Sequence, residues 1–312
     1  SARLMQAAQP GQTLVSQRIM QAAQKRYMFH QFPGFQVKGK YEAVPVATPV
    51  APLPPMPQMM PAGPLVGRDG EVAVLEEALN ALMAGQGKTL RVEGDTGLGK
   101  TRLVAELVQK AMMRGVRTLV GSALSTSLAS PYYPWREILN ALFGLQPIWP
   151  AQQQAMQIQN MLQWINPEWI PRVPLLGDLL GLEIPDTPMT AAFDARLRRE
   201  SLFALLGDLL ARMAMQQPLL ILIEDCHWAD EASRALIEAL ALSLAGARVL
   251  LVVTHRPSDQ PDRPILPGLA AAGHVKLQEL APASVQMLAA ARLGAELPPD
   301  LLALIQERAQ GI

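Results

Sequence analysis

Two uninterrupted runs of apolar residues most constrain how this chain can fold. LLILI spans residues 219–223, and RVLLVVT spans residues 248–254. Neither run alternates apolar with polar residues, so neither fits a strand that has one face in water. Strands covered by helices on both faces have this continuous pattern, and they are typical of parallel sheets. The two runs therefore predict an α/β fold around a buried parallel sheet.

Shorter elements alternate with these two strands. Residues 69–84 and the segment from Lys100 onward carry apolar residues at helical spacing, whereas residues 89–93 and 117–121 have the pattern of short strands. Such alternation is typical of a parallel α/β sheet. Residues 134–216 contain helical patches but no clear strand. We expect them to form a helical insertion between the second and third strands.

A proline-rich segment divides the chain. Residues 45–64 contain eight prolines and almost no charge. Proline lacks a backbone N–H and restricts the backbone, which disfavours helices and central strands and favours extended conformations. We therefore expect an interdomain linker over residues 47–64 rather than a docking motif. The predicted parts are then an N-terminal piece (1–46), a core (65–265) and a C-terminal helical piece (266–312).

The overall composition argues against several classes of protein. Lys and Arg together number 27, as do Asp and Glu, so the totals do not indicate a nucleic-acid partner. The single cysteine, Cys226, excludes an internal disulfide framework. No apolar run approaches the roughly 20 residues that span a bilayer, and the first residues lack the apolar core of a signal peptide. We expect a soluble, cytoplasmic protein that binds neither membrane nor nucleic acid.

Residues 94–101, GDTGLGKT, fit the pattern G-x-x-x-x-G-K-[ST] between a predicted strand and a predicted helix. Glycines allow backbone N–H groups to point at phosphate oxygens, and a helix N-terminus adds positive partial charge. Lys100 would reach the β- and γ-phosphates of a nucleotide, and the Thr101 hydroxyl would bind Mg²⁺. The other residues predicted to bind the nucleotide here are Gly94, Gly97, Leu98, Gly99 and Arg102.

Two acids, Glu224 and Asp225, directly follow the first apolar run. A carboxylate at the end of a buried strand is costly unless a positive group meets it. Mg²⁺ held between a triphosphate, Thr101 and these acids at the tip of a neighbouring strand meets that requirement, and one carboxylate can orient the attacking water. Position along the chain favours Glu224 as the metal-side acid, whereas chemistry favours an aspartate. Both acids are therefore assigned jointly to metal binding and catalysis.

Arg256 follows the second apolar run, where an arginine faces the crevice in which ligands bind. It could sense the γ-phosphate or stabilise its transfer, although a surface arginine is equally consistent with the sequence. His227, Trp228 and Asp230 are expected to order the loop behind the acids. No second histidine stands near His227, which argues against a metal-binding role.

Together these motifs resemble the STAND class of AAA+-related P-loop NTPases, in particular the ATPase module attached to bacterial class III adenylate/guanylate cyclases and to large ATP-dependent transcriptional regulators. The resemblance rests on LVGRDGEVAVLEEAL, EGDTGLGKTRLVAEL, SPYYPWREIL, LILIEDCHWAD, LLVVTHRP and LQELAPASVQMLAAARLG. It implies a P-loop NTPase fold with a central parallel sheet, a helical insertion and a partial helical lid. It also implies that Val66, Gly67 and Arg68 lie near the adenine.

The N-terminal piece resembles the tail of a class III nucleotidyl cyclase domain, which implies a small α+β remnant. SARLMQAAQPGQTLVSQ, with Arg3, is similar to a helix of that family, and FQVKGKYEAVPV is similar to its closing strands. The two metal-binding aspartates of that family are absent from this sequence. We therefore expect that this chain alone does not cyclise a nucleotide.

Three functions are compatible with these observations. The leading hypothesis is a signalling switch that binds ATP and Mg²⁺, hydrolyses ATP slowly, regulates an attached cyclase domain and could form a homo-oligomer. The first alternative is a small-molecule phosphotransferase, but the helical insertion offers no obvious acceptor-binding acids or histidines. The second is a nucleotide-binding scaffold or transcriptional regulator module without turnover, although no basic recognition helix is visible.

Overall fold

The computed structural model describes residues 13–23, 27–35, 44–52, 65–127, 130–258 and 264–293, together with residues 298 and 301. The chain divides into two compact units, of which the smaller comprises residues 1–57 with 145–150 and the larger comprises residues 58–144 and 151–312. Within the described part, no helix is long and apolar enough to cross a membrane. Parts of the sequence interpretation lie outside the described residues: residues 1–12 with Arg3, residues 36–43, residues 53–64 and, apart from residues 298 and 301, residues 294–312.

The smaller unit contains an antiparallel sheet in the order β1-β3-β2. Its elements are β1 (Val15–Ser16), α2 (Gln17–Ala23), β2 (Tyr27–Phe35) and β3 (Val44–Pro52). The expectation that the proline-rich segment from residue 45 forms no central strand is wrong, because β3 lies in the middle of this sheet. However, β1 pairs only with Val46 and Ala47. Pro45, Pro49 and Pro52 therefore fall where β3 has a single neighbouring strand, and a missing N–H is tolerated there.

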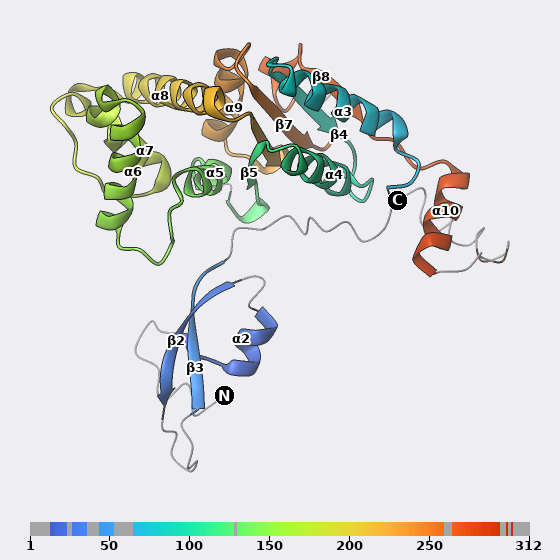
Figure 1. Ribbon diagram of the computed structural model, residues 1–312, viewed down its shortest axis with the longest axis horizontal. Coiled ribbons are helices and arrows are strands. Elements are labelled where there is room, and N and C mark those ends of the chain that lie inside the picture. The colour runs from blue at the N-terminus through green and yellow to red at the C-terminus, as the bar shows by residue number, and fades with distance from the viewer. Residues whose placement is uncertain are drawn as a thin grey trace. The chain divides into compact units, whose positions relative to one another are not determined.

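The larger unit is built on a five-stranded parallel sheet in the order β5-β6-β7-β4-β8 (Figure 1). The strands are β4 (Lys88–Glu93), β5 (Arg117–Ser122), β6 (Leu219–Glu224), β7 (Val249–His255) and β8 (Gly273–Lys276). Every residue of β6 and β7 is buried, as the continuous apolar runs predict. The predicted α/β fold, a P-loop NTPase-like parallel sheet, is confirmed together with its four predicted strands.

The fifth strand, β8, was not predicted. It has four residues, of which only Val275 is buried, so it carries no apolar run that a sequence pattern could reveal. Its pairing with β4 extends the sheet beyond residue 265, where the core was expected to end. The sheet therefore reaches Lys276, and Leu277 still belongs to the buried core cluster.

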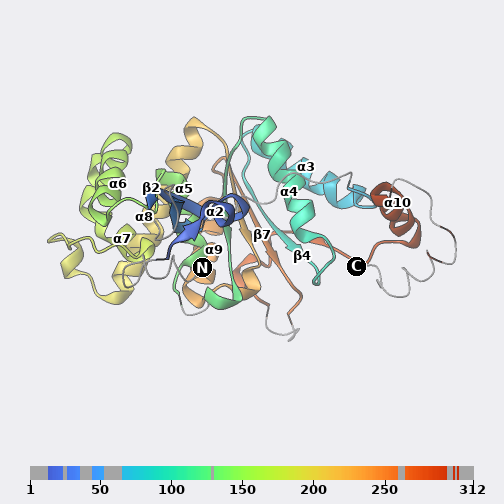
Figure 2. The same cartoon turned by 90° about the horizontal axis from the view of Figure 1, so that it is seen from below.

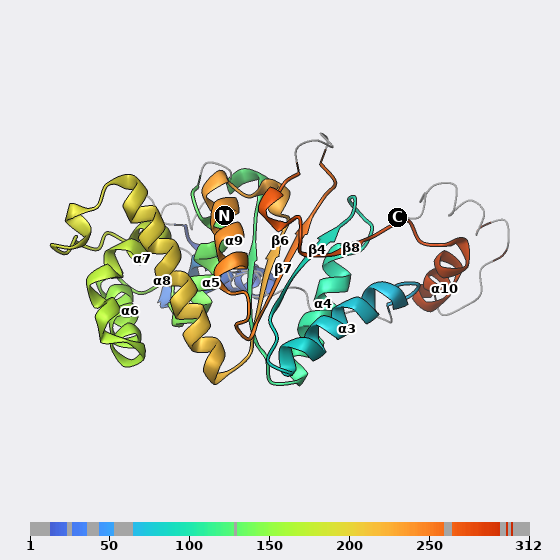
Figure 3. The same cartoon turned by 90° about the horizontal axis from the view of Figure 1, so that it is seen from above.

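Helices cover both faces of this sheet (Figures 2 and 3). α3 (Asp69–Met83) and α4 (Lys100–Met113) pack on one face, where their buried side chains share a core cluster with β4, β6, β7 and β8. On the other face lie α5 (Tyr133–Phe143), α8 (Ala195–Gln216) and α9 (Glu231–Ser243) (Figure 3). After β8 the chain forms α10 (Pro282–Leu293), in the segment predicted to begin the lid.

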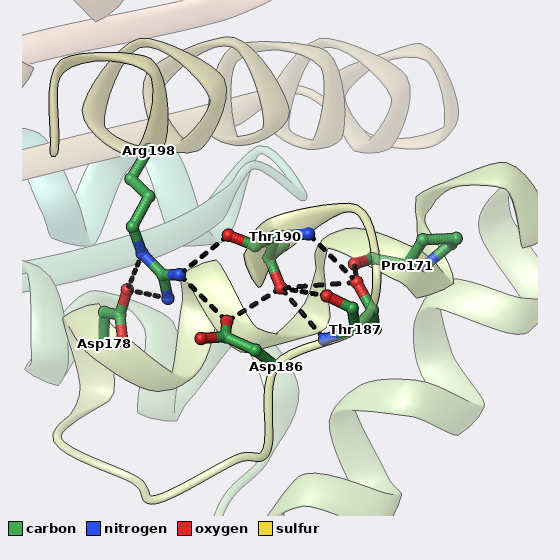
Figure 4. A network of polar contacts seen from close by, with 6 residues as sticks. All are labelled: Pro171, Asp178, Asp186, Thr187, Thr190 and Arg198. Carbon is green, nitrogen blue, oxygen red and sulfur yellow. Dashed lines mark hydrogen bonds and ion pairs between the residues drawn. The ribbon is translucent and has the colours of Figure 1, made fainter. Parts of the chain in front are cut away.

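The predicted helical insertion is confirmed for the described residues between β5 and β6. Besides α5 and α8 it contains α6 (Ala151–Ile165), α7 (Val173–Leu180) and the 3₁₀ turns Ser125–Ser127, Pro167–Arg172 and Thr190–Ala192. A polar network holds the loop between α7 and α8 (Figure 4). The Arg198 guanidinium donates to Asp178 at 2.7 Å, to Asp186 at 2.9 Å and to the Thr190 carbonyl oxygen at 3.1 Å. One arginine of α8 thus anchors this loop.

Candidate functional site

The glycine-rich loop joins β4 to α4 and contains two glycines in the left-handed region of backbone conformation. Gly97 and Gly99 have positive φ angles of 84° and 88°, which glycine adopts at little cost. Gly99 caps α4, and Lys100 is the first residue of that helix. Backbone N–H groups at a helix start lack intrahelical partners and carry positive partial charge. The loop and the helix therefore present donors to an anion at one place.

Lys100 is buried beneath this loop. Its Nζ donates to the carbonyl oxygens of Gly94 at 2.7 Å and Asp95 at 2.8 Å. Burial lowers the pKa of Lys100, the Asp225 carboxylate opposes this effect, and Arg256 lowers the pKa further. Because burial penalises the charged ammonium, an anionic ligand bound beside it would stabilise that charge.

Glu224 is the last residue of β6 and is only 9% exposed. Its carboxylate accepts a hydrogen bond from the side chain of Thr101, in the first turn of α4. Burial raises the pKa of Glu224, the Thr101 hydrogen bond opposes this, and the charge of Asp225 raises the pKa further. The structure thus brings together two of the predicted Mg²⁺ ligands, Thr101 and Glu224.

Asp225 differs from Glu224 in exposure and in backbone conformation. Its side chain is 48% exposed, and its φ of 55° lies in the left-handed region, which a short polar residue tolerates. The Asp225 N–H donates to Oγ1 of Thr254 at 3.0 Å, which fixes the turn against β7. The two acids therefore end in different surroundings although they are adjacent in the sequence.

Motifs that are far apart in the sequence line one cavity of about 470 Å³. Its lining consists of Thr96, Gly97, Gly99, Lys100, Thr101, Arg102, Ala105, Asp225 and Arg256. The sequence predicted that the two acids follow a strand adjacent to the strand that leads into the glycine-rich loop. This prediction is wrong, because β7 lies between β4 and β6. The cavity lies at the carboxyl ends of parallel strands, which is where open α/β sheets bind ligands.

The other residues predicted to belong to the site do not line this cavity: Val66, Gly67, Arg68, Gly94, Leu98 and Glu224. The Arg68 guanidinium instead donates hydrogen bonds to one side chain and to two backbone carbonyl oxygens. Its Nη1 donates to Glu71 at 2.9 Å, and its Nη2 donates to the carbonyl oxygens of Leu98 at 3.1 Å and Gln278 at 2.7 Å. Arg68 therefore ties the glycine-rich loop to the segment between β8 and α10.

Arg256 follows β7 and lines the cavity. Its Cζ lies 5.9 Å from the centroid of the Trp228 ring, within the range of a cation–π contact. Asp230 caps α9 by accepting the N–H of Ser233 at 2.9 Å. Trp228 thus contacts Arg256, and Asp230 caps the helix that follows the loop. That His227, Trp228 and Asp230 order the loop behind the acids stays a prediction.

A third carboxylate, that of Glu137 in α5, lies near these two acids and was not predicted from the sequence. Glu137 accepts the backbone N–H of Ser122 at 2.8 Å, and Ser122 pairs with Glu224 across β5 and β6. Burial raises the pKa of Glu137 to about 7, the Ser122 hydrogen bond opposes this, and the charge of Glu224 adds to it. The available signal was SPYYPWREIL, which contains Glu137 but does not show that α5 returns to the end of β5.

Comparison with known proteins agrees with this geometry. Residues 64–253, more than half of the chain, match the AAA ATPase domain family, and the chain therefore belongs to that family. An uncharacterized protein of Rhizobium meliloti (strain 1021) is 28% identical over 200 residues, which cover 63% of this chain and 19% of the relative. Adenylate cyclase type 10 of Oryctolagus cuniculus is 22% identical over 178 residues, which cover 57% of this chain and 11% of the relative. The matched regions thus span a fifth or less of these relatives.

Solved structures resemble this chain at low TM-score and low sequence identity. A STAND protein with a tetratricopeptide repeat sensor from Pyrococcus horikoshii has a TM-score of 0.41 and 18% identity, covering 80% of this chain and 29% of that one. A chain of Drosophila ORC bound to DNA has a TM-score of 0.46 and 14% identity, covering 81% of this chain and 54% of that one. No conclusion about this chain is drawn from similarity at this level.

Proposed function

We propose that this chain is a STAND-type module that binds ATP with Mg²⁺, hydrolyses ATP slowly and acts as a switch. The supporting observation is the single cavity that the glycine-rich loop, Asp225 and Arg256 line, with Glu224 hydrogen-bonded to Thr101. A phosphate-binding loop with its lysine, a hydroxyl and a carboxylate for the metal, and an arginine are recurring parts of phosphoryl-transfer sites.

The oxygen ligands of the site fit Mg²⁺, which is usually held by one or two carboxylates together with phosphate oxygens. We assign Glu224 to the metal side, because it is buried and bonded to Thr101. We assign Asp225 as the base, because it is half exposed and lines the cavity. Bound Mg²⁺ would neutralise charge on the phosphate oxygens.

The other side chains would act directly on the nucleotide and the water. Lys100 would exchange the carbonyl oxygens of Gly94 and Asp95 for phosphate oxygens. Asp225 would orient a water molecule and accept its proton. Arg256, held over Trp228, would stabilise the charge on the transferred phosphoryl group.

Nucleotide binding tests the first part of this proposal. Lys100→Ala should lower the affinity for ATP with Mg²⁺ by about tenfold or more, because it removes charge-assisted hydrogen bonds to phosphate. Lys88→Ala is the matched control, because Lys88 begins the same β4 strand and its Nζ lies 3.1 Å from Glu77. An affinity in Lys100→Ala equal to that of the wild type would refute the site.

Phosphate release tests turnover and the roles of the two acids. Asp225→Asn should retain ATP binding and lose about 10²- to 10⁴-fold in hydrolysis rate, whereas Glu224→Gln should weaken the Mg²⁺-dependent part of the affinity. The opposite result would reverse the two assignments. Turnover that requires an added acceptor would instead indicate a phosphotransferase, and binding without turnover would indicate a scaffold.

We further propose that the module regulates a nucleotidyl cyclase within a longer protein. The similarity to adenylate cyclase type 10 supports this proposal, as does the resemblance of the N-terminal piece to a cyclase tail. The test is cyclic nucleotide production by a protein that contains both domains, compared with the same protein carrying Lys100→Ala. Equal production of cyclic nucleotide by the wild type and by the Lys100→Ala variant would refute regulation. Light scattering with and without ATP tests the accompanying proposal of a homo-oligomer.

A further inference from the structure

His227 lies in the 3₁₀ turn Cys226–Trp228, directly after the two acids, and the mechanism above does not use it. Its side chain is 11% exposed. Neither ring nitrogen has a hydrogen-bond partner in the part of the chain that the structure describes. Each buried polar group without a partner costs about 1–3 kcal/mol, and such groups are rare in native proteins. Packing alone would be served better by an apolar ring, so these nitrogens call for a functional explanation.

The neighbours of the ring restrict what it can do. Nδ1 lies 3.9 Å from Oδ1 of Asp225, which is about 1 Å beyond hydrogen-bond distance. Burial lowers the pKa of His227, the Asp225 carboxylate opposes this, and Arg256 and Lys100 lower the pKa further. Lys and Arg side chains cannot accept a hydrogen bond, whereas an ionised carboxylate can only accept one. The Trp228 ring, with its centroid 5.1 Å away, confines the imidazole.

We infer that His227 is a positioning residue for Asp225: its Nδ1–H donates to one carboxylate oxygen and leaves the other oxygen to orient the attacking water and take its proton. The inference rests on the proposed function, because Asp225 acts as a base only if ATP is hydrolysed. The required approach of about 1 Å is a side-chain adjustment. The backbone of Asp225 stays fixed meanwhile by its hydrogen bond to Thr254. Hydrogen bonds in catalytic sites often shorten in this way once substrate is bound.

Three variants separate positioning from packing. His227→Asn places an amide N–H near the position of Nδ1, His227→Gln places one near Nε2, and His227→Phe keeps a ring without a donor. We expect His227→Asn to retain most of kcat. His227→Gln and His227→Phe should lower kcat by about 10- to 100-fold, as is usual when the support of a reacting group is removed. KM and ATP affinity should not change in any of them. Tm should rise in His227→Phe, because the apolar ring removes two buried nitrogens that have no hydrogen-bond partner. A wild-type kcat in His227→Phe would overturn the inference.

A spectroscopic measurement gives a result even without turnover. The chain has four histidines, so their imidazole ¹⁵N signals can be assigned by single substitutions. We expect a proton on Nδ1 of His227 in the wild type. This signature should be lost in Asp225→Gly, a change that suits the φ of 55°. A proton on Nε2 alone in the wild type would overturn the inference. Failure of the proposed function would look different, because the wild type would then bind or hydrolyse no ATP while the Nδ1 signature persisted.

Discussion

Glu137→Gln should stabilise the protein at pH 8 and leave its stability almost unchanged at low pH. Burial raises the pKa of Glu137 from 4.5 to about 7. A folded-state pKa above the unfolded value means that the folded protein binds the proton more tightly. The resulting stabilisation is fully present below about pH 4.5 and is lost as the pH rises through about 7. At pH 8 the wild type therefore holds a buried anion beside Glu224, and glutamine removes that charge.

The expected magnitude follows from the pKa of Glu137. A rise from 4.5 to about 7 corresponds to about 3 kcal/mol of differential interaction between the two protonation states. In the wild type the Ser122 N–H donates to the Glu137 carboxylate at 2.8 Å. The side-chain oxygen of glutamine can accept the same hydrogen bond, so the variant loses the charge and keeps this hydrogen bond. Because the surroundings relax around a buried charge, we expect the free energy of unfolding to rise by about 1–3 kcal/mol at pH 8.

Urea unfolding at pH 4.5 and pH 8, followed by fluorescence of the five tryptophans, measures this change. Glu183→Gln is the matched control, because Glu183 is an exposed glutamate in the same helical insertion. It should change the free energy of unfolding at neither pH. An equal effect of Glu137→Gln at both pH values would show that folding does not shift the pKa of Glu137, and destabilisation at pH 8 would show that Glu137 is held as a stabilised anion. Either result would refute the reasoning.

Two further predictions concern the support of the site. Gly67→Ala should lower stability by more than about 1 kcal/mol, because Gly67 has a φ of +67° and an added Cβ would lie 2.3 Å from Oγ of Ser284; Gly70→Ala, where nothing lies within 4 Å of the added Cβ, is the control in thermal unfolding. Arg198→Ala should lower Tm by about 2–4 °C without changing ATP affinity, because it removes hydrogen bonds to Asp178, Asp186 and Thr190. A loss of ATP affinity in Arg198→Ala would contradict a purely structural network.

Local sequence patterns predicted most of the sheet, because strands that are buried on both faces consist almost entirely of apolar residues. The residues of β6 and β7 are all buried and nearly all apolar, so these strands could be predicted without knowledge of their neighbours. β8 could not be predicted in this way, because it is an edge strand with one buried residue and therefore has no apolar run. The glycine-rich loop was predictable for a different reason, since its positive φ angles demand glycine at Gly97 and Gly99.

The parts of the site that the sequence did not reveal depend on long-range contacts. Glu137 reaches the ends of β5 and β6 only because α5 packs tightly there: a Cβ on Gly121 would lie 2.2 Å from the carbonyl oxygen of Pro134. Arg68 was expected near the adenine, yet its donors meet backbone carbonyl oxygens 30 and 210 residues away. The spacing of residues within a short stretch of sequence does not predict partners at such distances along the chain.

The hydrogen bonds around the loop have strengths in the range that the proposed switch would need. Lys100 holds the carbonyl oxygens of Gly94 and Asp95, and Arg68 holds those of Leu98 and Gln278. Hydrogen bonds to charged groups contribute about 1.5–3 kcal/mol each, and allosteric coupling free energies are typically about 1–3 kcal/mol. If phosphate binding drew Lys100 from its carbonyl oxygens and shifted the loop, the change at Leu98 would reach Gln278 through the single guanidinium of Arg68. Exchange of one or two such bonds is therefore sufficient to bias the segment that leads into α10.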